Sequence, residues 1–178
     1  MSKRAVALVS VLFIGVICLP VLASSARRLT FDELIIASDR VVEATITGAS
    51  SAWASDNRRI YTTFTFETQS NIAGTGDKRF NVVQPGGKIG RWAQITHGYP
   101  NFRKGDRVIL FLEEVPRGYR VVGLCQGVFG YLNDDSNDVI HQKLEGLHFP
   151  NDHGWPMVMD RLQAFEHIRT LFAKRRAP

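Results

Sequence analysis

Aromatic and cationic side chains gather in the segment 85–99. Lys88 and Arg91 supply positive charge there, and Trp92 and Tyr99 supply aromatic surface. Side chains of these types anchor protein partners and stack on sugars or on the bases of single-stranded nucleic acid. A long loop between two strands is also a common place for the binding surface of a small β domain. We therefore predict a partner-binding loop whose contact residues are Lys88, Arg91, Trp92, His97 and Tyr99.

A structural role is the alternative for the aromatic residues of this region. Trp92 and Phe102 are large enough to plug the open end of a β barrel, where their rings would be buried. For Trp92 the sequence leaves binding and plugging equally open, whereas for Phe102 it favours plugging.

The segment 141–153 contains side chains that ligate zinc, namely His141, His148, Asp152 and His153. A metal-dependent hydrolase that uses the three histidines is therefore an alternative function. Pro150, however, prevents the helix that an HExxH motif requires, and the spacing from 148 to 153 matches no helical ligand pair. We expect neither a metal nor any other cofactor.

The acidic run 134–138 holds oxygen ligands of the kind that calcium prefers. It lacks the central glycine and the final glutamate of a calcium-binding loop. Because it also separates two predicted strands, we predict a hairpin turn there.

The sequence contains no pattern typical of an enzyme. It has no Gly-x-Ser-x-Gly motif, and Cys125 follows an apolar run that predicts a buried thiol. Glu113 and Glu114 are neighbours on a predicted strand, so their carboxylates would point to opposite faces. The glycines at 86–90 and 74–76 lack the spacing of phosphate-binding loops, and we interpret them as turn residues with positive φ. We predict a protein without catalytic residues.

The first 26 residues are typical of a secretory signal peptide. Lys3 and Arg4 precede an apolar run that ends near Pro20 and is followed by small residues. Cleavage would lower the net charge of the 178-residue chain from +5 to +3, which does not indicate nucleic acid as a partner. The remaining chain would keep a single cysteine, which fits a periplasmic or secreted bacterial protein without disulfides. We predict export, no membrane span after cleavage, and a protein partner in the cell envelope or exterior.

The residues after the leader predict one mainly β domain. Strands are expected over 40–47, 59–68, 78–84, 107–113, 119–124, 128–132 and 139–142, because β-branched and aromatic residues alternate there with polar ones. Both faces of 107–113 are apolar, which places this strand at the centre of the fold. The expected architecture is an OB-like antiparallel barrel of five to seven strands over 27–145.

Two helices are expected to flank these strands. Thr30 and Glu33 form the pattern of a capping box, which predicts a short helix ending near Ser38. From 157 to 174, apolar residues recur at three- and four-residue steps, as in an amphipathic helix. We predict that the segment 146–178 is a connection followed by this helix, packed on the barrel through Val158, Leu162, Phe165, Ile168 and Phe172.

The order of these elements resembles the netrin-like OB fold of the tissue inhibitors of metalloproteinases. It also resembles a group of uncharacterised bacterial exported proteins that carry the same pattern. The resemblance extends from about Leu29 to Tyr131 and is carried by short motifs, SDRVVEATI, IYTTFTFE and FRKGDRVILFLEE. Its individual positions are Asp39, Val41, Val42, Phe102, Gly105, Leu110 and Phe111.

The resemblance implies a small exported barrel that binds another molecule. Inhibitors of that family chelate the protease zinc through an N-terminal cysteine, and no cysteine lies between Ser24 and Arg27. We therefore expect a non-catalytic binding module that engages a protein through the 85–99 loop. An oligosaccharide or oligonucleotide binder is a further alternative, because OB barrels commonly bind such ligands.

Overall fold

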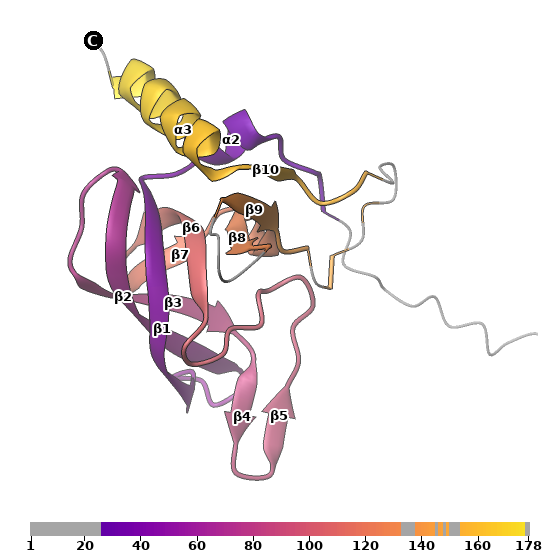
Figure 1. Cartoon of the computed structure of the whole chain (residues 1–178). Coiled ribbons are helices and arrows are strands. Elements are labelled where there is room, and N and C mark those ends of the chain that lie inside the picture. Colours follow the sequence, from indigo (N-terminus) through magenta and orange to yellow (C-terminus); the bar gives the residue numbers. More distant parts are fainter. Residues whose placement is uncertain (1–25, 133–137, 145, 148, 150–153, 177–178) are drawn as a thin grey trace, which may run out of the picture.

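A computed structural model describes residues 26–132, 138–144, 146–147, 149 and 154–176. Most of the strands belong to one sheet, and two helices lie at one end of it (Figure 1). The predicted mainly β class, the short N-terminal helix and the C-terminal helix are confirmed.

The short helix α2 (Phe31–Ile36) begins at the predicted capping box. The Thr30 hydroxyl accepts a hydrogen bond from the amide of Glu33, and the Glu33 carboxylate accepts one from the amide of Thr30. These two bonds satisfy amide groups that a helix start leaves without partners. The helix buries Leu34 and Ile35 against the sheet.

The main sheet has eight strands in the order β1-β2-β3-β7-β6-β8-β9-β10, and β1 also pairs with β6. The bounds are β1 Arg40–Trp53, β2 Ile60–Ala73, β3 Arg79–Pro85, β6 Arg107–Val115, β7 Gly118–Val121, β8 Val128–Tyr131, β9 Val139–Gln142 and β10 Val158–Asp160. A separate two-stranded sheet contains β4 (Gly87–Ile89) and β5 (Trp92–Gln94). A 3₁₀ turn over Leu124–Gly127 connects β7 to β8.

The sheet is mixed and larger than predicted. β3 and β7 pair in parallel at Val82 and Tyr119, whereas the sequence predicted antiparallel strands alone. Together with the β1–β6 pairing, this contact closes a ring of pairings through β1, β2, β3, β7 and β6. A single short parallel contact leaves no local sequence pattern, because it depends on how distant strands meet.

The first two strands are longer than predicted. β1 continues beyond the predicted end at 47, through small polar residues to Trp53, and β2 continues beyond the predicted end at 68 to Ala73. The two pair along almost their whole length, and the register shifts three times, between Val41 and Val42, between Glu43 and Ala44, and between Ile46 and Gly48. Cross-strand pairing therefore overrides the weak strand propensity of 48–52.

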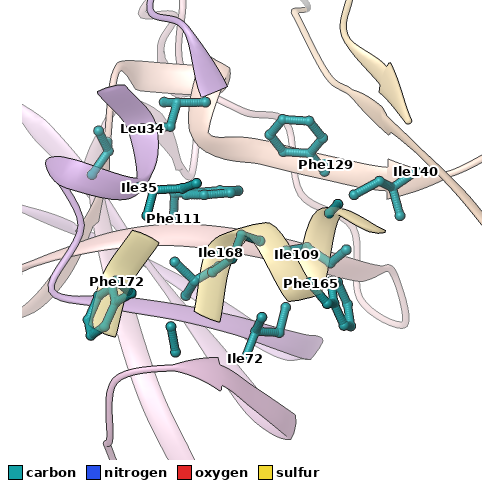
Figure 2. Packing of buried hydrophobic residues seen from close by; sticks show 14 residues of the cluster. Leu34, Ile35, Ile72, Ile109, Phe111, Phe129, Ile140, Phe165, Ile168 and Phe172 are labelled. Atoms are coloured by element: carbon teal, nitrogen blue, oxygen red, sulfur yellow. The ribbon is translucent and has the colours of Figure 1, made fainter. Parts of the chain in front are cut away.

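The apolar residues form two separate clusters, one on each side of β1 and β6. The outer cluster combines the helices with the outward residues of the sheet, including Ile109, Phe111 and Phe129 (Figure 2). The inner cluster fills the strand ring with residues such as Leu110 and Phe66. β6 contributes to both clusters, so its predicted central position is confirmed.

The C-terminal helix α3 (Arg161–Arg176) begins later than predicted. Phe165, Ile168 and Phe172 are buried in the outer cluster, as expected for a helix packed on the sheet. Two residues of the predicted apolar stripe are not: Leu162 is exposed, and Val158 lies in β10 and is exposed there. β10 pairs with β9, so the chain adds an edge strand before the helix starts. Neither helix in the described part of the chain has the length and apolar character that crossing a membrane requires.

Candidate functional site: the tryptophan cleft

The segment 85–99 contains a β hairpin and is not the irregular loop that the sequence predicted. β4 and β5 pair across a turn at Gly90 and Arg91 and project from the end of the sheet opposite the helices (Figure 1). Gly90 has a φ of 55°, a left-handed conformation that glycine adopts without strain. The predicted turn role of this glycine is confirmed.

The base of this hairpin is fixed to β2 by hydrogen bonds. The amide of Gly86 donates to the carbonyl of Ile60, and the amide of Ile60 donates to the side-chain oxygen of Gln94, each at 2.8 Å. The Thr62 hydroxyl donates to the carbonyl of Gly86 at 2.7 Å. These bonds come from both arms of the hairpin, so its orientation relative to the main sheet is defined.

Gly87 is required at the hairpin base for two reasons. Its φ is 139°, and a Cβ atom there would lie 2.3 Å from Thr62 Oγ1 and 2.6 Å from Ser51 Oγ. Any other residue would therefore push the hairpin away from the two strands.

Gly76, outside the hairpin, also lies close to another residue, although its φ is ordinary. A Cβ there would lie 2.6 Å from the buried Arg40 guanidinium. The predicted positive φ is confirmed for Gly74, Gly86, Gly87 and Gly90 but wrong for Gly76.

Two tryptophans from different parts of the chain meet beside the hairpin. Trp92 of β5 lies edge-to-face against Trp53 at the end of β1, with ring centroids 6.5 Å apart. Both rings reach solvent, with exposed fractions of 57% for Trp92 and 39% for Trp53. The rings line a cleft of about 590 Å³, which we call the tryptophan cleft. Its other lining residues are Asn57, Arg58, Ile60, Ala93 and Gln94.

Positive charge borders the tryptophan cleft. The guanidinium of Arg91 lies 5.4 Å from the centre of the Trp92 ring, and Arg58 is part of the cleft lining. Lys88 is exposed on the neighbouring arm of the hairpin. The nearby Asp56 carboxylate accepts a hydrogen bond from the amide of Arg58. Cationic groups therefore outnumber the carboxylate at this end of the molecule.

No protein-family model and no curated protein matches this chain. A functional proposal therefore rests on the geometry of the tryptophan cleft: the rings of Trp53 and Trp92, the β4–β5 hairpin and the cations beside them.

The structure brings together some of the five predicted contact residues. Trp92 lines the tryptophan cleft, Arg91 stacks on its ring, and Lys88 pairs with Ala93 across the hairpin. His97 is exposed and Tyr99 is half-buried, but both lie past β5 on the way back to the main sheet. Neither residue lines the tryptophan cleft.

Trp92 and Phe102, for which binding and plugging were the two alternatives, differ in burial. Phe102 is buried against Phe64 and Phe66, with ring centroids 5.2 Å apart in both pairs. Its predicted burial is confirmed. Trp92 is exposed and plugs nothing.

Sequence reasoning missed the other wall of the cleft. Trp53 ends β1, Ile60 begins β2, and Arg58 lies in the turn between the two strands. An isolated tryptophan among small polar residues was the available signal, since a large aromatic residue in such a segment often marks a binding surface.

A second polar group of residues was also missed, and it is built around the buried carboxylate of Glu43 on β1. Oε1 of Glu43 accepts hydrogen bonds from the Tyr131 hydroxyl and from Arg107 Nε, each at 2.5 Å, and Arg107 Nη2 completes an ion pair with the same oxygen. The Arg107 guanidinium also lies 4.7 Å from the centre of the Tyr131 ring. Only 5% of the Glu43 side chain is exposed, so its charge depends on these two partners.

This arrangement raises the pKa of Tyr131. Burial of the phenol has the largest effect, followed by the hydrogen bond to Glu43 and the negative charge of that carboxylate. Each of these three effects disfavours the negatively charged phenolate form of Tyr131.

We expect Tyr131 to make the folded chain sensitive to alkaline pH. An unfolded tyrosine ionises near pH 10, whereas folded Tyr131 keeps its proton to higher pH. Above pH 10 the unfolded state therefore binds fewer protons, and the free energy of unfolding falls as the pH rises. Urea unfolding at several pH values between 8 and 11.5 should show a shallower decline for Tyr131→Phe. An unchanged slope would contradict this role for Tyr131, and Tyr61→Phe serves as the control for losing a phenol.

The predicted metal-binding side chains lie mostly outside the described residues. His148, Asp152 and His153 are among the residues that the structure does not describe, as is the acidic run 134–137. His141 lies in β9, half-buried and paired with Gly130 of β8. Among the described residues, no group of three His, Cys, Asp or Glu side chains is placed to hold a metal ion. Cys125 is buried, as predicted.

Proposed function

We propose that this chain is an exported, non-catalytic binding module that holds a segment of a protein partner in the tryptophan cleft. The observation that supports this proposal is the contact between Trp53 and Trp92, which leaves both rings accessible beside an open cleft. Large exposed aromatic rings cost free energy in water and are typical of the residues that contribute most to binding. A hairpin fixed at its base limits the ordering cost of binding.

The chemistry of the cleft favours an acidic segment that carries an apolar side chain. The apolar side chain would be buried between the two tryptophan rings and Ile60, while carboxylates of the partner would face Arg58 and Arg91. Opposite charges on the two surfaces increase the association rate and help to fix the orientation. The predicted contact residues Lys88, His97 and Tyr99 would lie at the edge of this interface.

We further propose that the strand ring is an OB-like barrel. The pairing order β1-β2-β3-β7-β6 with return to β1, and the parallel contact of β3 with β7, support this proposal. So does the inner cluster, because the interior of a small barrel is filled by side chains. A crystal structure in which β3 and β7 are not paired would contradict it. The resemblance to the netrin-like fold is part of the same proposal.

The proposal of export rests on the basic and apolar leader in residues 1–26. The protein would be expressed with this leader and recovered from the periplasmic or secreted fraction. Intact mass spectrometry should then show a chain that begins between residues 24 and 27. Recovery of the chain only inside the cell would contradict export.

We expect Trp92→Ala to weaken partner binding by about 30-fold or more, because an aromatic residue of this kind contributes about 2 kcal/mol or more at an interface. Partners would be captured from the exported fraction with the immobilised protein, identified by mass spectrometry and purified. Their affinity for the native chain and for Trp92→Ala would then be measured by titration calorimetry.

Trp155→Ala is the matched control, because Trp155 is 88% exposed and does not line the tryptophan cleft. Equal affinities of the native chain and Trp92→Ala would overturn the proposal. Nucleic acid as the ligand would show a steep fall of affinity with salt. For an oligosaccharide ligand, the affinity would not fall steeply with salt, and no protein would be captured.

A further inference from the structure

Polar cavities next to Glu43 form a second candidate site, separate from the tryptophan cleft. The larger has a volume of about 520 Å³ and is lined by Gly105, Asp106, Arg107, Gly130, Tyr131, His141 and Lys143. A smaller one, of about 210 Å³, is lined by Asn101, Arg103, Asp106 and Lys143. The two share Asp106 and Lys143, and neither shares a residue with the tryptophan cleft.

Two nitrogen atoms converge in the larger cavity above Gly130. A Cβ atom at Gly130 would lie 3.4 Å from His141 Nε2, 3.5 Å from Lys143 Nζ and 2.7 Å from Lys143 Cε. The ring nitrogen and the ammonium group thus approach the same point from β9 and from the residue that follows it. The missing side chain at position 130 leaves space for these two groups. The β8–β9 pairing, in which Gly130 is opposite His141, fixes this geometry.

The charges that line the cavities are mainly positive. Arg103, Arg107 and Lys143 carry permanent positive charge, and Asp106 is the single carboxylate among the lining residues. One oxygen of Asp106 already accepts a hydrogen bond from the amide of Arg103 at 3.0 Å. Glu43 lies beneath Arg107 and is occupied by Arg107 and Tyr131. Arg107 is therefore held in place at the wall of the cavity.

We propose that these cavities bind a phosphate-type oxyanion, with Lys143 and His141 as its principal ligands. The lysine ammonium donates to the oxyanion, the imidazole contributes Nε2, and Arg107 adds positive charge at the wall. Charge-assisted hydrogen bonds to oxyanions are about twice as strong as those between neutral groups. The Glu43–Arg107–Tyr131 group then has a positioning role, because it orients one cation of the site.

The proposal is tested by titrating the purified protein with inorganic phosphate, phenyl phosphate and acetate, at constant ionic strength set with chloride. Amide chemical shifts in ¹⁵N-labelled protein report both the affinity and the place of binding. Saturable shifts at residues 130, 141 and 143 are expected with phosphate. Phenyl phosphate shows whether an esterified phosphate also enters, and its failure to bind would assign the site to the free anion. Acetate is expected to bind more weakly, and equal binding of acetate would overturn the preference for phosphate.

Lys143→Gln is expected to weaken phosphate binding by about tenfold, since it removes a charge-assisted contact. Gly130→Ala should have a similar effect because its methyl group fills the space between the two nitrogens. Lys104→Gln is the matched control: Lys104 is exposed in the adjacent turn and does not line either cavity. Equal effects of Lys143→Gln and Lys104→Gln, or no saturable shift in the native protein, would overturn the proposal. Far-ultraviolet circular dichroism would verify that each variant is folded.

Discussion

Phe111→Ala should lower the free energy of unfolding by about 3–5 kcal/mol, the usual range for removing a buried phenylalanine ring. Phe111 is 1% exposed and lies at the centre of the outer cluster. Its ring contacts Phe31 and Phe129, with centroids 5.7 and 5.5 Å away. The truncation therefore leaves a cavity between α2, β6 and β8, which adds to the lost free energy of burial. Since whole domains are stable by about 5–15 kcal/mol, this one change removes a large part of the total.

Urea unfolding followed by circular dichroism would measure the loss. The control is Leu162→Ala on α3, where the side chain is 66% exposed. That variant should change the free energy of unfolding by no more than about 0.5 kcal/mol, as is usual for surface positions. Equal losses in the two variants would show that the outer cluster is packed differently.

Arg107→Met is expected to destabilise the fold by about 3–5 kcal/mol, because it leaves the Glu43 carboxylate buried without a cation. The Tyr131 hydroxyl is then the remaining donor to Glu43 that the structure shows. The double variant Arg107→Met with Glu43→Gln should recover part of the loss, since the amide carries no charge. The same urea unfolding measurement applies to both variants.

Arg120→Met is a matched control for this ion pair. Arg120 of β7 pairs with Glu113 of β6 at 2.7 Å, but both side chains are exposed, by 55% and 41%. Exposed pairs contribute about 0–1 kcal/mol, because water screens both charges. A similar cost for Arg107→Met and Arg120→Met would mean that burial of Glu43 does not govern the strength of its ion pair.

Features with a local cause could be predicted from the sequence. The capping box at Thr30 and Glu33 depends on four consecutive residues, and the structure has both of its hydrogen bonds. β6 was predicted as a central strand because its two faces are apolar, and each face packs into a different cluster. β8 and β9 have nearly the predicted bounds, because β-branched and aromatic residues predict them locally.

Features that depend on distant contacts could not be predicted. The strands β4 and β5 have three residues each and contain no clear alternation, so their pairing shows only in three dimensions. Trp53 becomes part of a cleft because β1 extends beyond its apolar segment and meets Trp92. Glu43, Arg107 and Tyr131 are far apart in sequence, and each looks like an ordinary strand residue. Their meeting follows from the β1–β6 and β6–β8 pairings.

The outer cluster has a consequence for the order in which the protein folds. It is covered by α2 from the beginning of the described chain and by α3 from its end, so no continuous half of the sequence can complete it. Contacts between segments so distant form late, because a long loop must be closed before they contribute. During synthesis, the apolar outer face of β6 therefore stays accessible until Ile168 and Phe172 have emerged. Exposed apolar surface of this kind is a target for chaperones that bind unfolded chains.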